Sequence, residues 1–270
     1  MRKVEYTDVQ TKIQRLMGVD TLLTSEQNSI LAAVNKYCRM AWERARWPEL
    51  CRTQQRAVNG RVSSVTIDSS GSGYTSAPSV AFSTGLASAT STVKDEEVNA
   101  VLLTHGGQNY ATAPTVTFSG GAGSGATGTA NLSFTLDYEG AAPYIGDVFT
   151  IYKNDPDKTA YPDELSFRLN ENGALMHNKT DATPVFVHFR QRFKDYTSTS
   201  TDLPYLFEQY FIQGAFADMM LAEGQHDKAN NALMIAEQIL VSELDKLERQ
   251  QSQEQHSRIL THVNQQNSIY

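Results

Sequence analysis

The chain has 270 residues, of which 40% are hydrophobic and 20% charged, and its formal net charge is −7. That length is enough to bury a substantial core, and the composition is typical of a soluble globular protein. The acidic balance argues against a general nucleic-acid binder, because affinity for phosphate needs clustered Lys and Arg. No apolar run approaches the roughly 20 residues that cross a bilayer, so no membrane partner is expected. The N-terminal MRKVEYTDVQ lacks the apolar stretch of a signal peptide.

The charges are distributed unevenly along the chain. Residues 1–60 carry a net charge of +4, residues 61–134 of −2, and residues 135–270 of −9. The middle block is therefore nearly uncharged, while the two ends have opposite signs. Only Cys38 and Cys51 are present, which excludes a disulfide framework and makes a reducing compartment the default.

The N-terminal block has the pattern of two helices. Thr7 with Gln10, and Thr24 with Gln27, each have the spacing of a capping box. Apolar residues follow each box at helical spacing, and Gly18 ends the first helix. Pro48 ends the second helix, since proline disfavours helical backbone in the residue before it. The domain 1–60 is predicted to hold these helices.

A 36-residue repeat occupies the middle of the chain. GSGYTSAPSVAFS recurs as GQNYATAPTVTFS, and each copy has the pattern of a strand, a Gly-rich turn, a Tyr-x-x-Ala-Pro corner and a second strand. Residues 61–134 are therefore predicted to be an inserted all-β domain, here called the repeat module. Tyr74 and Tyr110, one in each corner, are its candidate exposed-surface residues.

Strands and then helices are predicted after the repeat module. DVFTIY, ELSFRL and PVFVHFRQRF alternate apolar and polar residues, which predicts a small antiparallel sheet over about 144–194. Asp202 as the N-cap and Pro204 in the first turn indicate a helix that Gly224 separates from a longer one. Residues 135–248 are assigned to this sheet and helical hairpin. The Gln-rich residues 249–270 are predicted to be a flexible C-terminal tail.

The sequence contains no pattern of a catalytic or cofactor site. Gly123–Gly128 matches G-x-G-x-x-G, but the residues after it alternate like a strand, whereas a dinucleotide site needs a helix there. The histidines form no H-E-x-x-H and no zinc spacing with the cysteines. We expect no enzymatic activity, no cofactor and no metal.

Outside the repeat module the chain resembles the phage head–tail connector, or adaptor, proteins. The resemblance rests on the order and spacing of AWERARWPEL, DVFTIY, LSFRLNENGAL and VFVHFRQRF, followed by the hairpin YLFEQYFIQGAFADMMLAEGQHDKANNALMIAEQIL. The two repeats look like the G-x-G-Y-T-x-A-P-x-V-x-F-S-G units found inserted in many phage structural proteins. The second copy departs from that unit at Gln108-Asn109.

The resemblance implies an α+β fold, with a helical bundle core and a small antiparallel sheet, into which the repeat module is inserted. It also implies a dodecameric ring in the virion neck, assembled in the host cytoplasm, that joins the portal protein to tail or nozzle proteins. DNA would be only passing cargo. The oppositely charged ends of the chain favour head-to-tail contacts in such a ring.

The family also implies that a C-terminal extension docks onto the portal. A Gln-rich segment with scattered apolar residues suits folding on binding. The predicted anchors are the large apolar groups of that segment: Ile259, Leu260, Val263, Ile269 and Tyr270.

The alternative function is a tail or fibre-attachment protein. In this case the β repeats bind a glycan, a receptor or a fibre protein, and Tyr74 and Tyr110 offer stacking surfaces. The competing interpretation of the two tyrosines is that they pack the repeat corners.

Overall fold

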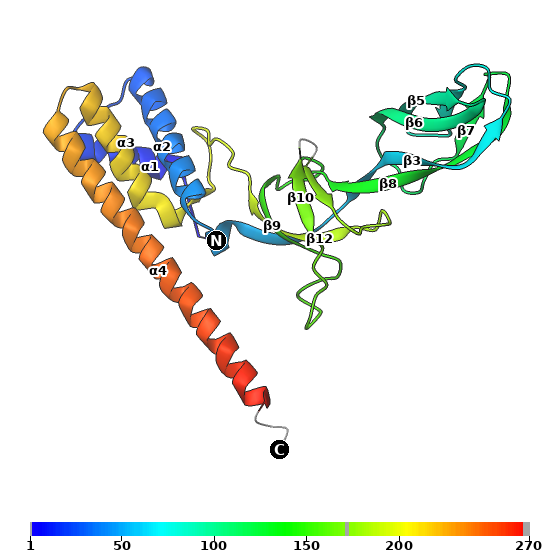
Figure 1. Cartoon of the computed structure of the whole chain (residues 1–270). Helices are drawn as coiled ribbons and strands as arrows, with labels where there is room; N and C mark the ends of the chain where they lie inside the picture. Colours follow the sequence, from blue (N-terminus) through cyan, green and yellow to red (C-terminus); the bar gives the residue numbers. More distant parts are fainter. Residues whose placement is uncertain (1, 171–172, 267–270) are drawn as a thin grey trace. The chain divides into compact units, whose positions relative to one another are not determined.

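The computed structural model describes residues 2–170 and 173–266, with side chains described up to residue 251. The chain divides into two compact units. Residues 1–50 and 193–270 form the first, here called the helical unit, and Cys51–Arg192 form the second, here called the β unit. Figure 1 shows the helices and strands of each.

The predicted fold class is wrong. The described residues contain 32% helix and 36% strand, and the strands form four small antiparallel sheets, not one. The protein is therefore a mixed α and β structure in which a helical bundle is not the common core. The apolar residues described form three cores, one in the helical unit and two in the β unit.

The helical unit brings the first and last parts of the chain together. Its elements are β1 (Lys3–Val4), α1 (Tyr6–Met17), α2 (Thr24–Arg44), η1 (Pro48–Leu50), β13 (Leu203–Pro204), η2 (Tyr205–Phe207), α3 (Glu208–Ala222) and α4 (His226–Gln266). β1 pairs with β13 in antiparallel fashion, and α3 packs against α1, α2 and α4. α3 begins after the predicted Asp202 cap because residues 203–207 form β13 and a 3₁₀ turn instead.

Aromatic side chains join the two sequence segments of the helical unit. The ring of Trp47 meets that of Phe207 edge to face at 5.1 Å between centroids. Tyr37 and Tyr210 form a second edge-to-face pair at 5.7 Å. Such pairs add about 0.5–1.5 kcal/mol each to the hydrophobic gain. The fold of this unit thus depends on contacts between residues more than 150 positions apart.

The β unit contains three of the four sheets. One has the order β2–β12–β9, from Cys51–Arg56, Val185–Gln191 and Ile145–Tyr152. The next has the order β10–β11–β8–β3, from Phe167–Asn170, Gly173–Met176, Ser124–Leu136 and Val58–Ser72. The third has the order β6–β5–β4–β7, from Glu97–Gly106, Ala87–Lys94, Ser79–Phe82 and Val116–Ser119.

The pairing of β3 with β8 explains why the prediction of one small sheet fails. These are the first and last strands of the repeat module, and they pair from Val58↔Leu136 to Ser72↔Ser124. Near the start of this ladder, β8 also pairs with β11 on its other edge, through Met176↔Phe134. Residues predicted as an insertion and residues predicted as the surrounding sheet therefore share one sheet and one core.

Helix α4 continues through most of the segment that is predicted to be a flexible tail. Its backbone is helical to Gln266. The stretch RQQSQEQHSRILTHVNQQ contains neither Gly nor Pro, and six of its 18 residues are Gln, which has high intrinsic helix propensity. Amphipathic patterning is weak in this stretch. The prediction of a flexible tail, which rested on the Gln-rich composition, overlooked the intrinsic helix propensity of these residues.

Gly214 offers a test of the packing between α2 and α3. A Cβ at this position would lie 2.5–2.7 Å from three ring atoms of Tyr37. That ring is buried, and its hydroxyl donates to Asp218 at 2.9 Å, so it has little freedom to move. Gly214→Ala should destabilise the helical unit by about 1–2 kcal/mol, the overpacking cost less the helix-propensity gain of alanine. Urea unfolding measures the change.

The matched control for Gly214 is Gln213→Ala, one position away on the same helix. It should change the unfolding free energy by less than about 0.5 kcal/mol. An unchanged or higher stability of Gly214→Ala would show that α2 and α3 are not in such close contact.

Candidate functional site

The repeat module is built around an approximate twofold axis. β4 pairs with β7 so that Val80 lies opposite Phe118 and Phe82 opposite Val116. At the repeat length of 36 residues, Val80 corresponds to Val116 and Phe82 corresponds to Phe118. Exchanging the two repeats therefore converts one of these pairs into the other and leaves the ladder unchanged. The axis thus passes through the pair Ala81↔Thr117. The two repeats are therefore equivalent halves of one structure.

The irregularities of the other two ladders obey the same symmetry. The ladder of β3 and β8 skips Ser63 and Asp68. The ladder of β5 and β6 skips Asn99 and Thr104, which occupy the same positions of the second repeat. β-Bulges bend and twist a strand locally, so equivalent bulges give the two halves the same curvature.

Each repeat tyrosine packs against the loop that belongs to the other repeat. The hydroxyl of Tyr110 donates to the carbonyl of Thr84 at 2.6 Å and accepts from the amide of Ala87 at 3.2 Å. The hydroxyl of Tyr74 accepts from the amide of Ala126 at 3.3 Å. Each corner of the module is thus closed by residues of both halves.

Tyr74 and Tyr110 are buried, each with only 3% of its surface exposed. The expectation that they are exposed is therefore wrong, and they offer no stacking surface. The reason is the glycines that face them. A Cβ at Gly85 would lie 2.2 Å from the Tyr110 ring, and one at Gly123 would lie 2.5 Å from the Tyr74 ring. Only glycine lets each loop backbone lie against the ring.

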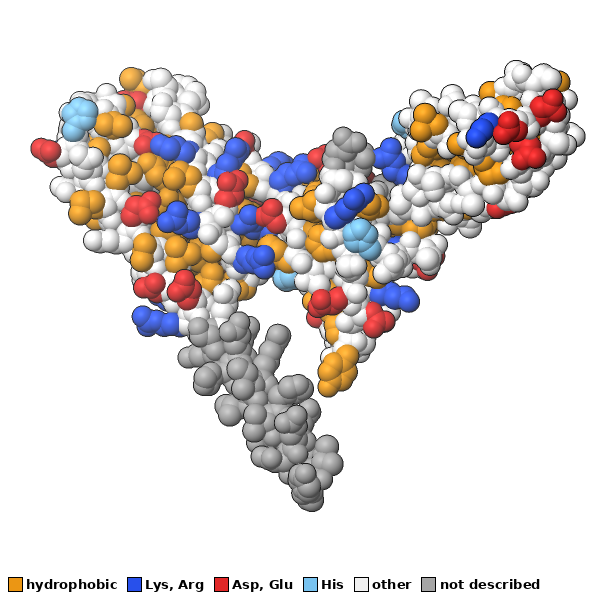
Figure 2. Space-filling view, viewed as in Figure 1, with side chains coloured by type: hydrophobic (Ala, Val, Ile, Leu, Met, Phe, Trp, Pro, Cys, Tyr) orange, Lys and Arg blue, Asp and Glu red, His pale blue; other side chains and the backbone are white. Residues whose placement is uncertain are grey.

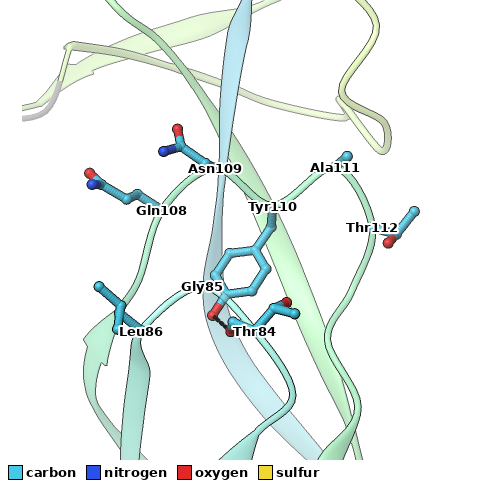
Figure 3. Close-up of a pocket in the computed structure, with 8 residues that line it drawn as sticks. All are labelled: Thr84, Gly85, Leu86, Gln108, Asn109, Tyr110, Ala111 and Thr112. Carbon is cyan, nitrogen blue, oxygen red and sulfur yellow. Dashed lines mark hydrogen bonds between the residues drawn. The ribbon is translucent and has the colours of Figure 1, made fainter.

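A cavity of about 320 Å³ lies beside Tyr110, as Figure 3 shows. We call it the second-corner cavity. The loop at 84–86 forms one side of it and residues 108–112 form the other. No charged side chain lines it; the lining residues are Thr84, Gly85, Leu86, Gln108, Asn109, Tyr110, Ala111 and Thr112.

A second cavity, of about 460 Å³, contains a buried lysine. Residues 111–113 and 130–132 line it together with Lys179, Thr180 and Asp181. The Nζ of Lys179 donates to Thr183 at 2.7 Å and forms an ion pair with Asp181. The hydrogen bond from Lys179, followed by those from Thr183, lowers the pKa of the Asp181 carboxyl. Because the lysine charge is already neutralised, this cavity has no net attraction for an anion.

The helical unit has its own internal ion pairs. Lys12 pairs with Glu208, Lys36 with Asp218 at 2.8 Å, and Arg39 with Asp195 at 2.8 Å. Each links the basic N-terminal segment to the acidic C-terminal one. The opposite charges of the two chain ends are therefore partly paired with each other within the molecule.

Apolar side chains remain on the outer face of α4. Met234 and Val241, seven residues apart, are 61% and 47% exposed. They lie opposite the face of α4 that buries Ala229, Ala236 and Leu240. Figure 2 shows hydrophobic side chains interspersed with charges of both signs over the helical unit.

Part of the predicted docking segment lies outside the described residues. Ile269 and Tyr270 are not described, and Ile259, Leu260 and Val263 lie within the helical backbone of α4, beyond the last described side chain. α4 has 41 residues and α3 has 15, which correspond to about 61 Å and 22 Å at 1.5 Å per residue. Figure 1 shows α4 continuing past the other helices of its unit.

The remaining reactive groups of the described residues do not assemble into a site. Among the residues described, no three His, Cys, Asp or Glu side chains are grouped to hold a metal ion. Burial raises the pKa of the Cys38 thiol to about 12, so little thiolate exists near neutral pH. No helix in the described part of the chain is both long and apolar enough to span a membrane.

Comparisons with known proteins found no matching family model, no matching curated protein and no matching solved structure.

The second-corner cavity was missed by reasoning from the sequence, although one signal pointed to it. Gln108-Asn109 is the place where the second repeat departs from the pattern of the first. Leu86 gave a further signal, since Ala122 occupies its position in the other repeat. The cavity itself depends on pairing between the repeats, which the sequence does not reveal.

Removing the two tyrosine hydroxyls should have unequal effects. Tyr110→Phe leaves the Thr84 carbonyl and the Ala87 amide without this partner, and should cost about 1–3 kcal/mol. Tyr74→Phe loses the single bond from Ala126, at 3.3 Å, and should cost about 1 kcal/mol or less. Amide hydrogen exchange at Ala87 and Ala126 measures each local opening. Equal acceleration of exchange in the two variants would contradict the geometry.

Proposed function

We propose that this protein is a structural component of the virion, the subunit of a head-to-tail adaptor ring that joins the portal protein to the tail around the DNA channel. The observation that carries the proposal is the length of α4 relative to α3. The shorter helix can accompany only about the first third to half of the longer one. The rest of α4 is therefore available to another protein.

Helix stability supports this interpretation of α4. Helices draw most of their stability in water from packing of an apolar face, and isolated helices are marginal. Residues 259, 260 and 263 bring Ile, Leu and Val to one side of a helical backbone by spacing alone. A groove on the portal would cover such a stripe, as in helix-in-groove recognition. The resemblance to the adaptor family supplies the identity of this partner.

The acidic balance of the chain suits a channel that DNA passes without adhering. A net charge of −7 per subunit repels phosphate, and repetition around a ring multiplies the effect. Duplex DNA is in this proposal a passing cargo, and the neck of the virion is where the protein acts. Tail or nozzle proteins are its partners on the other side of the ring.

Docking onto the portal can be tested on the full-length protein. The double variant Ile259→Asp/Leu260→Asp should weaken binding to the purified portal more than about tenfold, because apolar anchors carry most of the energy of such interfaces. Sedimentation and surface plasmon resonance measure the change. The control Gln253→Asp/Ser257→Asp adds the same two charges to the same helical stretch at polar positions and should bind normally. Equal binding by both variants would refute docking through these anchors.

Ring formation involves a second surface of the helical unit. We propose that Met234 and Val241 contact the next subunit, since the outer face of α4 leaves both exposed. Native mass spectrometry of the full-length protein, alone and with portal, should detect ring-sized assemblies, a dodecamer as the expected state. Met234→Asp/Val241→Asp should shift the population to monomers.

The control for the ring surface places the same charges on a neighbouring strip of α4. Asn231→Asp/Ser242→Asp changes exposed residues about a quarter turn away, and should still assemble. A wild-type chain that stays monomeric with and without portal would overturn the adaptor proposal as a whole.

A further inference from the structure

The repeat symmetry identifies one corner of the module as different from the other. We define the first corner by residues 72–76 and 120–123, and the second by residues 84–86 and 108–112. The two share the tyrosine and the glycine that lies against its ring, Gly121 in the first corner and Gly85 in the second. They differ where side chains point outward: Leu86, Gln108 and Asn109 of the second corner correspond to Ala122, Ser72 and Gly73 of the first.

The larger residues of the second corner lie together at its cavity. Figure 3 shows the amide ends of Gln108 and Asn109 on the same side of their loop, the side on which Leu86 also lies. The backbone amide of Gln108 donates to the carbonyl of Gly85 at 3.2 Å, which holds the two loops together. Within the described part of the chain, neither amide side chain has a hydrogen-bond partner, so both are available to a ligand.

Leu86 is in an unfavourable state in the free protein. It is 85% exposed, and its φ of 61° lies in the left-handed region that bulky side chains avoid. Ala122 holds the same conformation, with a φ of 66°, with a much smaller side chain. The turn therefore does not require leucine. Strained residues of this kind are typical of ligand-binding loops, where covering the side chain offsets the cost.

The chemistry of the lining selects the class of ligand. Two amides supply both donors and acceptors, Thr84 and Thr112 add hydroxyl groups, and Leu86 adds an apolar surface. Phosphate or carboxylate ligands call for Arg or Lys, and the lining has neither. On the face drawn in Figure 2, few charged side chains lie on the repeat module. A volume of about 320 Å³ is at the small end of ligand pockets.

We propose that the second-corner cavity binds one unit of a neutral saccharide. Its hydroxyl groups pair with the side chains of Gln108 and Asn109, and its C–H face packs against Leu86. The buried Tyr110 supports the loop from beneath and does not touch the ligand. This site does not depend on the adaptor function, and a chain that forms no ring could still have it.

The test is a saccharide array probed with the full-length protein, with neutral and acidic oligosaccharides side by side, followed by calorimetric titration of the best neutral binder. The decisive variant is Leu86→Ala/Gln108→Ser/Asn109→Gly, which gives the second corner the residues of the first. Because those residues already occupy the same backbone conformation in this protein, the variant should fold. Its affinity should fall at least about tenfold.

The matched control is Ser72→Ala/Ser76→Ala, which alters the first corner only, and its affinity should stay within about twofold of wild type. Three results would overturn the proposal: no saccharide bound by the wild-type chain, a preference for acidic saccharides, or equal losses in both variants. If the wild-type chain bound a protein partner through Leu86 and bound no saccharide, the second corner would instead be a protein-docking site.

Discussion

The antiparallel ladder of β3 and β8 is the contact on which the β unit depends. From Val62 onward it places Val62 and Ala130 in the small core of the repeat module. Its first three pairs place Val58, Phe134 and Leu136 in the core of the next sheet. One pair of strands thus serves two cores, and removal of residues 61–134 would also take Phe134 from the second. The repeat module consequently shares a sheet and a core with the rest of the β unit, and is not a separate domain joined by a linker.

The helical unit is held together by an analogous closure between distant segments, achieved with side chains. Exposed ion pairs such as that of Arg39 and Asp195 contribute little, because solvent screens them and ordering long side chains costs entropy. Most of the cohesion comes from buried apolar groups, such as Trp47, Phe207 and Tyr210, that exclude water from between the segments. The opposite charges of the two chain ends thus help to align the N-terminal and C-terminal segments, while burial of apolar side chains holds these segments together. In the proposed ring, the interface would therefore draw on other surfaces, such as the outer face of α4.

Local patterns in the sequence predicted local structure. The apolar stripes of α1 and α2 required only neighbouring residues, and the structure has them. β2 was missed because CRTQQR lacks alternation, and its strand forms through pairing with β12. The single-sheet prediction failed for the same reason, since β3 and β8 are joined across more than 50 residues of intervening chain. Periodicity contains no information about such partners.

The candidate site was predictable in part, and the symmetry explains which part. Gly85, Gly121, Tyr74 and Tyr110 are constrained by close packing, because a Cβ at Gly85 would lie 2.2 Å from the Tyr110 ring and one at Gly121 would lie 3.0 Å from the Tyr74 ring. Both repeats must keep these residues to fold, so their presence in both repeats is explained by packing and does not indicate a binding function. Leu86, Gln108 and Asn109 face outward, where no packing constraint requires them, and there the two repeats differ. In a duplicated unit, the residues that both repeats share thus identify the positions needed for folding. The exposed positions at which the repeats differ identify where one repeat can have a binding function of its own. Tyr110 was the prominent sequence feature, yet its role is to position the residues beside it.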